Sequence, residues 1–540
     1  MSVIANVQSV LATLTILNTW INGNELNILT EYEFPSSQIG DINHVSNDMF
    51  PPNFKFGFST SAFQFEGAWN KSGKSESVWD HMIHDNPSII ADRSNADVAD
   101  DFYHHYKEDI KTAKVLGSNM LRISLSWPRI LPNGFSNKIN IHAIKFYNEV
   151  INEMIANGIE PMVTLFHWDT PHILQEMGGF LNPLIQDNFV NYARVAFAAF
   201  GDRVKYWVTF NEPNIFCQRG YGGPMVPMYN QSGLFDYLCS YNLLLAHAKT
   251  YNLYNREYRE RQNGKIGIVN NYFMYYPSNP NSEEDKQATM KALIWGNDWF
   301  TSPIFGRDGD YPELMKATIL KKSISQNFET SRLPSFTREE IEFIRGSADF
   351  LGVNYYTSRL VKAKKYYNDV VNYYADSEIE LNSNNDEWKG DLWVKNAPKG
   401  LGAILHYLNT AYNIPEIYIT ENGYADFGEI LDLGRVVYYH QHLWEVLFAM
   451  KKGVNIRGYL AWSLLDNFEW MDGYSTRFGS IYVDFSKASK PRQAKLSAQV
   501  LKDVYTKRKI RKIAQVIGSE ELAAQAIEKY GFPIDFSQLD

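Results

Sequence analysis

The feature that most constrains the fold of this chain is a regular alternation of short apolar runs with longer, helix-like stretches. From residue 54 onward, eight of the runs have the length and composition of buried β-strands. They are residues 56–65, 119–127, 160–168, 205–213, 265–271, 349–356, 416–423 and 455–463. Helix candidates between them include residues 97–116, 141–157 and 189–200. This order predicts an α/β fold, a single (β/α)8 TIM barrel with extended loops after its strands.

The barrel is predicted to occupy residues 51–508 as one domain, because barrels of this kind exceed the usual domain length. Residues 509–540 are predicted to form a C-terminal helical extension, with an amphipathic helix at residues 519–529. Apart from a short apolar run near the N-terminus, no stretch approaches the length and apolar character of a membrane span.

The first 50 residues are predicted to form a leader and an irregular arm. Residues 10–17 are apolar enough for the core of a signal peptide over about residues 1–23, although no Lys or Arg precedes Lys55. Two glycosylation sequons are compatible with export, at Asn70-Lys71-Ser72 and Asn230-Gln231-Ser232. We therefore expect a secreted protein, in a gut lumen or a similar compartment. A cytoplasmic or vacuole-like location is the alternative.

Charge and cysteine content exclude several classes of partner. The net charge is −9 and no basic run dominates, so we expect no nucleic-acid partner. No glycine-rich phosphate loop is present, and the two cysteines, Cys217 and Cys239, lack the spacing of a metal site. They either form one disulfide or stay free. The sequence thus implies no metal and no cofactor.

Polar residues of a chemically useful kind fall at the ends of the predicted strands, where barrels of this type place their active sites. These residues are Gln64, Arg122, His167, Asn211, Glu212, Tyr356, Glu421 and Trp462. Glu212 and Glu421 end the fourth and seventh runs, on opposite sides of a small barrel, so their side chains can face each other across its mouth. A pair of carboxyl groups is what cleavage of a glycosidic bond requires.

Six motifs in this order resemble those of glycoside hydrolase family 1, the β-glucosidase family. They are SAFQFEG at residues 61–67, TLFHWD at 164–169, TFNEP at 209–213, DFLGVNYY at 349–356, YITENG at 418–423 and WSLLDNFEW at 462–470. The resemblance extends over about residues 50–508. Details such as the position of Cys217 and the PIFG at residues 303–306 are similar to animal, especially insect, members.

The resemblance implies a retaining mechanism with a covalent glycosyl-enzyme. Glu212, before a proline, would be the acid/base, and Glu421, before Asn-Gly, would be the nucleophile. Retaining enzymes hold two such carboxyls about 5 Å apart, too close for a water molecule between them. Arg122 and the hydroxyl of Tyr356 would hold Glu421 ionised, while Glu212 keeps its proton near neutral pH.

The same resemblance implies a sugar pocket. Asn211 would bind the 2-hydroxyl, His167 the 3-hydroxyl, and Gln64 with Glu469 the 3-, 4- and 6-hydroxyls, because a carboxylate accepts strong hydrogen bonds. The remaining implied positions are Trp462 beneath the sugar, Trp470 with its indole N–H, Phe478 at the 6-carbon, Trp393 against the aglycone, and Asn354 in support. Each could be a core or turn residue when taken alone. An acidic Glu469 would repel a phosphate, so the expected substrate is a non-phosphorylated β-D-glucoside.

The sequence departs from the family pattern near the entrance. Thr170 follows His-Trp-Asp, and Lys399 stands between Pro398 and Gly400 where many animal members have tryptophan. A basic residue there, Lys399 or Arg345, would favour an anionic aglycone. That leaves open a myrosinase-like thioglucosidase acting on glucosinolates, besides a transglycosylase or a catalytically silent sugar-binding relative. The aglycone, the preferred sugar and the oligomeric state, monomer or homodimer, stay open.

Overall fold

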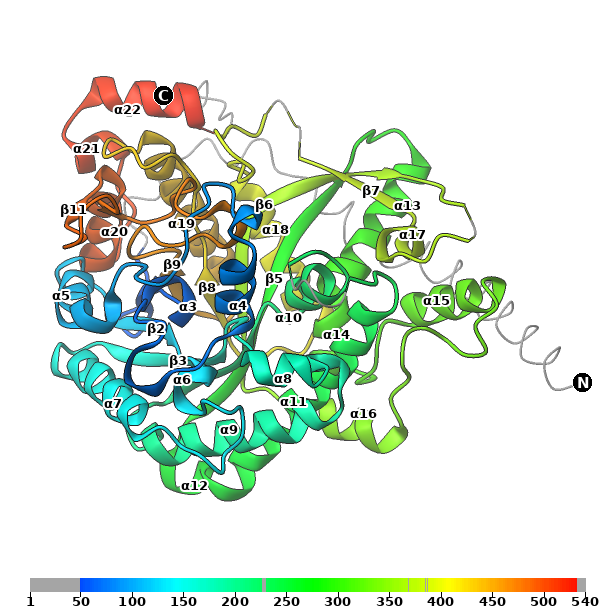
Figure 1. The fold of residues 1–540 in the computed structure, drawn as a ribbon. Helices are drawn as coiled ribbons and strands as arrows, with labels where there is room; N and C mark the ends of the chain where they lie inside the picture. Colours follow the sequence, from blue (N-terminus) through cyan, green and yellow to red (C-terminus); the bar gives the residue numbers. More distant parts are fainter. Residues whose placement is uncertain (1–48, 226–229, 368, 384, 386, 532–540) are drawn as a thin grey trace, which may run out of the picture.

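Eight parallel strands close into a barrel in the computed structural model, which describes residues 49–225, 230–367, 369–383, 385 and 387–531. They run β5-β4-β3-β2-β1-β9-β8-β6 around the ring, and β6 pairs with β5 to close it. The strands are β1 Lys55–Ser59, β2 Met120–Ser124, β3 Glu160–Phe166, β4 Tyr206–Asn211, β5 Lys265–Pro277, β6 Phe350–Ala363, β8 Ile417–Glu421 and β9 Ile456–Ala461. The predicted (β/α)8 fold is confirmed (Figure 1). The predicted leader lies outside the described residues.

The barrel strands are almost fully buried because side chains fill the inside of the ring and helices cover its outside. An inner apolar layer takes one residue from each of seven strands: Met120, Met162, Val208, Val269, Phe350, Tyr418 and Leu460. The barrel is therefore a packed core and not a pore. Polar side chains follow this layer toward the carboxyl ends of the strands, which leaves that end for chemistry.

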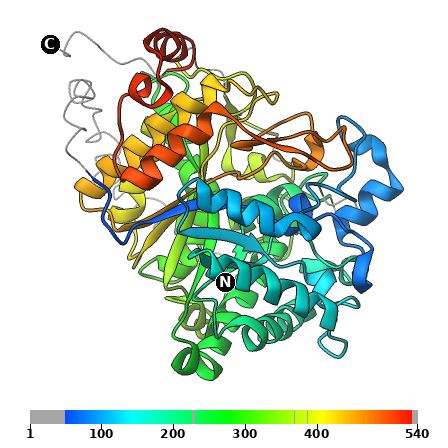
Figure 2. The same cartoon turned by 90° about the vertical axis from the view of Figure 1, so that its left-hand side faces the viewer.

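Helices connect successive strands and form the outer layer (Figure 2). Those between β1 and the end of the barrel domain include α5 Phe102–Val115, α7 Ile141–Ala156, α9 Leu184–Phe200, α11 Phe235–Glu257, α13 Glu283–Leu293, α14 Trp299–Phe305, α15 Glu313–Ser325, α16 Arg338–Ile344, α18 Pro398–Ala411, α19 Leu433–Lys451 and α20 Leu496–Lys507. The other helices are α3 Ala62–Phe65, α4 Val78–Asp85, α6 Trp127–Ile130, α8 His172–Glu176, α10 Pro213–Ile215, α12 Arg259–Gln262, α17 Tyr373–Ser377, α21 Ile513–Ile517 and α22 Glu520–Tyr530. Short helical turns lie at η3 Lys71–Gly73, η4 Pro87–Ile89, η5 Gly179–Leu181, η6 Phe216–Tyr221, η7 Ile294–Asp298 and η8 Trp470–Asp472.

Three strand boundaries differ from the sequence-based expectation in ways that matter for the site. The first predicted run ends as a strand at Ser59 and continues as α3, which is tied to β2 because Ser124 Oγ accepts from the amide of Ala62 at 2.7 Å. Gln64 therefore lies on a helix and not at a strand end. The strands β5 and β6 continue well past the barrel, and the antiparallel β7 Ile379–Asn382 pairs with the far end of β6. A separate hairpin joins β10 Ile481–Val483 to β11 Arg492–Ala494.

Cys217 and Cys239 form a disulfide, which answers the alternative that the sequence left open. The bond joins η6, which follows β4 and the short helix α10, to α11. It anchors the segment that follows Glu212. No helix among the described residues combines the length and apolar character needed to cross a membrane.

Candidate active site

A cavity of about 330 Å³ opens at the carboxyl ends of the barrel strands. Such a volume lies in the range of small-molecule sites. Most of the residues expected from the sequence line it: His167, Asn211, Glu212, Tyr356, Trp393, Glu421, Trp462, Glu469, Trp470 and Phe478. The other three, Gln64, Arg122 and Asn354, are fully buried behind the lining side chains.

Glu421 ends β8 and is held on both carboxylate oxygens. Arg122 Nη1 donates to Oε1 at 2.6 Å, and the hydroxyl of Tyr356 donates to Oε2 at 2.7 Å. Burial raises the pKa of Glu421, while the guanidinium of Arg122 and the hydroxyl of Tyr356 oppose that rise. Because a cation touches this carboxylate directly, Glu421 is the group of the pair that is set up to be ionised.

Glu212 follows β4 and has a different environment. None of the described residues brings a cation into contact with it, and burial together with the charge of Glu421 raises its pKa to about 7. Its backbone adopts φ +46°, a left-handed conformation uncommon outside glycine, immediately before the proline that begins α10. Such conformations concentrate at functional sites. Glu212 is 7% exposed and lines the cavity.

Two asparagine side chains fix the Glu212 carboxyl. Asn354 Nδ2 donates to Glu212 Oε1 at 2.9 Å, and Asn271 Nδ2 donates to the same oxygen at 3.0 Å. The Asn354 amide also helps to stabilise the ionised form of Glu421. One amide group can serve both carboxyls only when they lie close together. Asn271, at the end of the fifth predicted run, was missed by the sequence analysis, although the strand-end rule pointed to it.

Arg122, Asn211 and His167 form a chain of hydrogen bonds beside Glu421. Arg122 Nη2 donates to Asn211 Oδ1 at 2.7 Å, and Asn211 Nδ2 lies 3.2 Å from His167 Nε2. Burial and the charge of Arg122 lower the pKa of His167 well below its ordinary value, so its ring is neutral. With Nε2 accepting from Asn211, the proton lies on Nδ1, for which the described residues supply no hydrogen-bond partner.

Aromatic rings and one acid form the far wall of the cavity. His167 stacks against Trp462 and Trp470, with centroids 5.9 Å apart in each case. Glu469 lies beside them, and Gln64 Nε2 donates to its Oε2 at 3.3 Å. Burial and the neighbouring carboxyls raise the pKa of Glu469 well above its usual range. Its role as an acceptor for sugar hydroxyls stays a prediction. Gln64 supports Glu469 from behind, and its direct contact with a sugar stays a prediction.

The entrance carries two arginines that the sequence analysis did not identify. Tyr356, Trp393 and Phe478 form one side, with ring centroids 5.7 to 6.1 Å apart. Arg219 of η6 and Arg359 of β6 line the cavity as well. Arg359 was missed because its strand was expected to end at residue 356.

The two basic residues suggested from the sequence lie elsewhere, so that placement was wrong. Arg345 follows α16 and precedes β6, at the amino end of the strand and thus at the opposite end of the barrel. Lys399 is half-buried near the start of α18, facing Glu445, and does not line the cavity. The basic character of the entrance comes from other residues.

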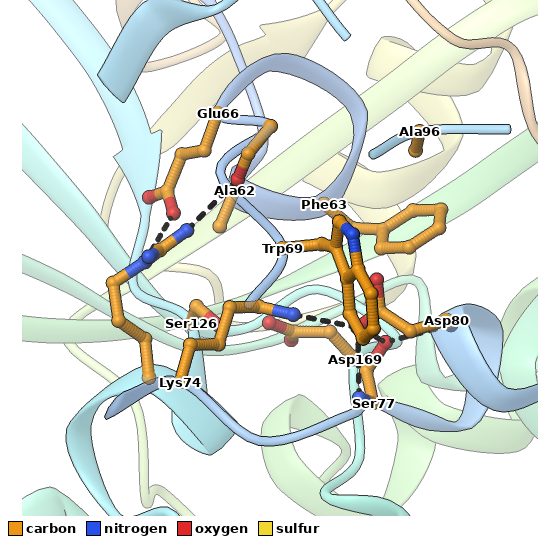
Figure 3. A pocket seen from close by; sticks show the side chains of 12 residues that line it. Ala62, Phe63, Glu66, Trp69, Lys74, Ser77, Asp80, Ala96, Ser126 and Asp169 are labelled. Atoms are coloured by element: carbon orange, nitrogen blue, oxygen red, sulfur yellow. Dashed lines mark hydrogen bonds and ion pairs between the residues drawn. The ribbon is translucent and has the colours of Figure 1, made fainter. Parts of the chain in front are cut away.

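A second, small cavity of about 10 Å³ lies behind the His-Trp-Asp segment (Figure 3). Lys74 Nζ contacts Asp80 Oδ2 at 2.6 Å, and in Figure 3 the ammonium group also points toward Asp169. Arg129 pairs with Glu66 at 2.9 Å. Burial raises the pKa of Asp169 well above its usual range. This volume is too small for a substrate, so the cluster is a buried polar support for the end of β3.

Within the described residues, no group of three or more His, Cys, Asp or Glu side chains is placed to hold a metal ion. Of the two carboxyls, Glu421 is bound to a cation and Glu212 has a raised pKa, which is the contrast that glycoside cleavage by an acid and a nucleophile requires.

Comparison with known proteins agrees with this geometry. The model of glycosyl hydrolase family 1 matches residues 46–510. Beta-glucosidase 24 of Oryza sativa subsp. japonica is 43% identical over 489 residues, 85% of this chain and 94% of that protein. Myrosinase 1 of Brevicoryne brassicae is 40% identical over 84% of this chain and 98% of its own. The solved structure of aphid myrosinase superposes with a TM-score of 0.81 at 39% identity, covering 85% of this chain and 99% of that chain. The protein belongs to glycosyl hydrolase family 1.

Proposed function

We propose that the protein is a retaining β-glucosidase that hydrolyses non-phosphorylated β-D-glucosides. The observation that carries this proposal is the contrast between two buried carboxyls in one cavity. Glu421 is bound by Arg122 and Tyr356, whereas no cation of the described part of the chain contacts Glu212, whose pKa is raised to about 7. The amide of Asn354, which serves both groups, supports the short separation of a retaining enzyme.

In the first step, a carboxylate oxygen of Glu421 attacks the anomeric carbon and forms an ester. The bond from that carbon to the glycosidic oxygen breaks, and Glu212 gives its proton to the departing oxygen. The aglycone leaves as a neutral alcohol. Arg122 and Tyr356 hold the attacking carboxylate in place, which lowers the entropy that must be lost on reaching the transition state.

In the second step, Glu212 acts as a base. Esterification removes the negative charge of Glu421, which is one cause of the raised pKa of Glu212, so the ionised form of Glu212 becomes more favourable. Glu212 takes a proton from water, the oxygen of that water attacks the anomeric carbon, and Glu421 departs as a carboxylate. Glucose is released with its β-configuration. An alcohol in place of water would give transglycosylation with the same residues.

The test is hydrolysis of p-nitrophenyl β-D-glucoside by the parent and by Glu421→Gln. The matched control is Glu342→Gln, the same substitution at an exposed residue of α16. We expect activity in the parent and the control, and a loss of turnover in Glu421→Gln with unchanged binding of D-glucose. Turnover retained by Glu421→Gln would contradict the nucleophile assignment, and glucose binding without turnover in the parent would indicate the sugar-binding alternative.

A second candidate activity is the cleavage of glucosides with an anionic aglycone, such as glucosinolates. Arg219 and Arg359 line the entrance, and within the described chain no carboxylate pairs with either. Burial and the charge of Arg219 lower the pKa of Arg359, so two like charges face one another there. Arg359 also lies over the ring of Phe273, 5.0 Å from its centroid. An anionic group between the arginines would remove this repulsion.

The Arg219 and Arg359 pair is tested by comparing kcat/KM for a glucosinolate and for a neutral aryl glucoside. In Arg359→Gln we expect the ratio to fall about tenfold or more, since a charge-assisted hydrogen bond contributes about 1.5–3 kcal/mol. Arg345→Gln, on the opposite end of the barrel, serves as control. No activity on glucosinolates, or an unchanged ratio in Arg359→Gln, would exclude this candidate.

Export from the cell, an insect-type lineage and the oligomeric state remain proposals. The Cys217–Cys239 disulfide and the exposed sequon residues Asn70 and Asn230 support export. A mass decrease after enzymatic removal of N-glycans from the protein secreted by eukaryotic cells would test it. The aphid relatives support the insect-type assignment. Since one chain builds the whole cavity, a monomer would suffice, and sedimentation distinguishes it from a homodimer.

A further inference from the structure

The helix α22, Glu520–Tyr530, lies beyond the residues that the family model matches, which end at residue 510. Figure 1 shows it at the upper edge of the molecule, beside α21 and next to α19. Its buried face places Ala523 and Ala526 in a small apolar cluster with Val436 and Val437 of α19 and Val500 of α20. A helix added outside the family core is therefore packed firmly onto the barrel layer.

The last turn of α22 contacts the segment of residues 389–396, which we call the entrance segment. Asn396 Nδ2 donates to the carbonyl oxygen of Tyr530 at 2.8 Å and to Gln441 Oε1 of α19 at 2.7 Å. Asn396 is 1% exposed. The final carbonyls of a helix lack partners within the helix, so this amide satisfies one of them at the negative end of the helix dipole.

The entrance segment carries the indole that lines the cavity mouth. Trp393 is three residues before Asn396, and its ring faces Tyr356 and Phe478. The two ends of the segment are joined, because the backbone N–H of Asn396 donates to the backbone carbonyl of Lys389 at 2.7 Å. A contact that fixes Asn396 therefore also fixes the base of the short loop that carries Trp393.

The same end of α22 also contacts the segment that follows the nucleophile. The ring of Tyr530 packs edge-on against Tyr424, with centroids 6.4 Å apart. Tyr424 is three residues after Glu421, and its hydroxyl accepts from the amide of Asp391 at 3.2 Å. Tyr530 and Asn396 thus link the entrance segment, the chain after β8 and the added helix at one point.

We propose that α22 positions the entrance segment and thereby sets how tightly the aglycone is held, with Asn396 and Tyr530 as the connecting residues. The part that concerns the aglycone rests on the proposed β-glucosidase function. The positioning of the entrance segment does not rest on that function, because it concerns only how rigidly residues 389–396 are held.

The test compares Ala526→Glu with Ala524→Glu in the full chain. The two substitutions are identical and lie on the same helix, but Ala526 is fully buried and Ala524 is exposed. We expect amide hydrogen exchange in residues 389–396 to rise about tenfold in Ala526→Glu only, because the local opening becomes easier. Exchange in β8 should not change. Asn396→Ala, which leaves the apolar cluster intact, should reproduce the effect.

The kinetic readout separates positioning from a general loss of structure. In Ala526→Glu and Asn396→Ala, the KM for aryl glucosides should rise about fivefold, the loss expected for one hydrogen bond, with little change in kcat. Inhibition by D-glucose, which occupies only the sugar pocket, should stay the same. A glucose affinity that falls in parallel would indicate a general loss of structure and would overturn the proposal.

Failure of this inference and failure of the proposed function give different results. Unchanged exchange in residues 389–396 in both variants refutes the positioning of the segment, whatever the parent hydrolyses. Raised exchange with an unchanged KM refutes the link to the aglycone. A parent that cleaves no β-glucoside refutes the proposed function, while the exchange result still decides whether α22 orders the entrance segment.

Discussion

The raised pKa of Glu212 leads to a prediction about the pH dependence of catalysis. The first step needs Glu212 protonated, so kcat/KM should fall as the pH rises through about 7. With a pKa of about 7, about nine tenths of the enzyme carries this proton at pH 6. With an ordinary pKa near 4.5 the protonated fraction would be about 3%, so the environment of Glu212 increases the active form about 30-fold.

The assay measures kcat/KM from about pH 4 to pH 9 with two substrates, p-nitrophenyl β-D-glucoside and an alkyl β-D-glucoside. In Glu212→Gln the alkaline limb should disappear, because the titrating group is gone. The loss of rate should reach about 10²- to 10⁴-fold for the alkyl glucoside, whose leaving oxygen needs a proton. It should be far smaller for formation of the glycosyl-enzyme from the nitrophenyl glucoside, whose leaving group is already stable as an anion.

Two outcomes would refute this reasoning. An alkaline limb that persists at the same pH in Glu212→Gln would show that another group titrates there. Equal losses for the alkyl and nitrophenyl glucosides would show that Glu212 does not protonate the leaving oxygen. Because kcat/KM reports the free enzyme, the limb can be compared directly with the unliganded structure.

Three further predictions concern residues around the pair and the disulfide. In Arg122→Met, Glu421 loses its cation and the pKa of Glu421 rises, so the acidic limb of kcat/KM should move to higher pH. The free energy of unfolding in urea should fall by about 3–5 kcal/mol. An acidic limb that does not move would contradict the assignment of Glu421 as the ionised nucleophile. In Asn271→Ala, Glu212 loses a hydrogen-bond donor that stabilises its ionised form, so the alkaline limb of kcat/KM should move about one pH unit upward. A shift to lower pH would contradict this role of Asn271. Replacing Cys217 and Cys239 together by alanine should cost about 3 kcal/mol in calorimetry, given their separation of 22 residues, whereas an unchanged Tm would argue against the bond.

The barrel was predictable because strands buried on both faces are apolar runs, and eight of them alternate with helices. The glutamates were predictable for a related reason, since a polar residue at the end of such a run must lie at the barrel mouth. Gln64 shows the limit of this rule. Its run is buried throughout, yet it changes from strand to helix after Ser59, and periodicity does not resolve so short a change.

The entrance could not be predicted in the same way. Arg359 lies within a strand that continues beyond the barrel, and the sequence gives no local sign of where the closed ring ends. Arg219 lies in η6, next to the disulfide, where no strand-end rule applies. Which side chains meet there depends on how separate loops pack on one another, and a single sequence does not encode that packing in any local pattern.

The extension of β5 and β6 past the barrel has a consequence for how such an enzyme can change. The two strands stay paired from Met274 to Pro277 and from Ser358 to Val361, outside the closed ring, and β7 is their added edge. Arg359 and its neighbours therefore belong to a ribbon whose sequence can vary without breaking a strand pair of the ring. The same two strands thus carry hydrogen-bond partners of the carboxyl pair in one part, Asn271, Asn354 and Tyr356, and the entrance residue Arg359 in another. Selection or design could change the sequence of the ribbon to suit a different leaving group, while the carboxyl pair keeps its geometry.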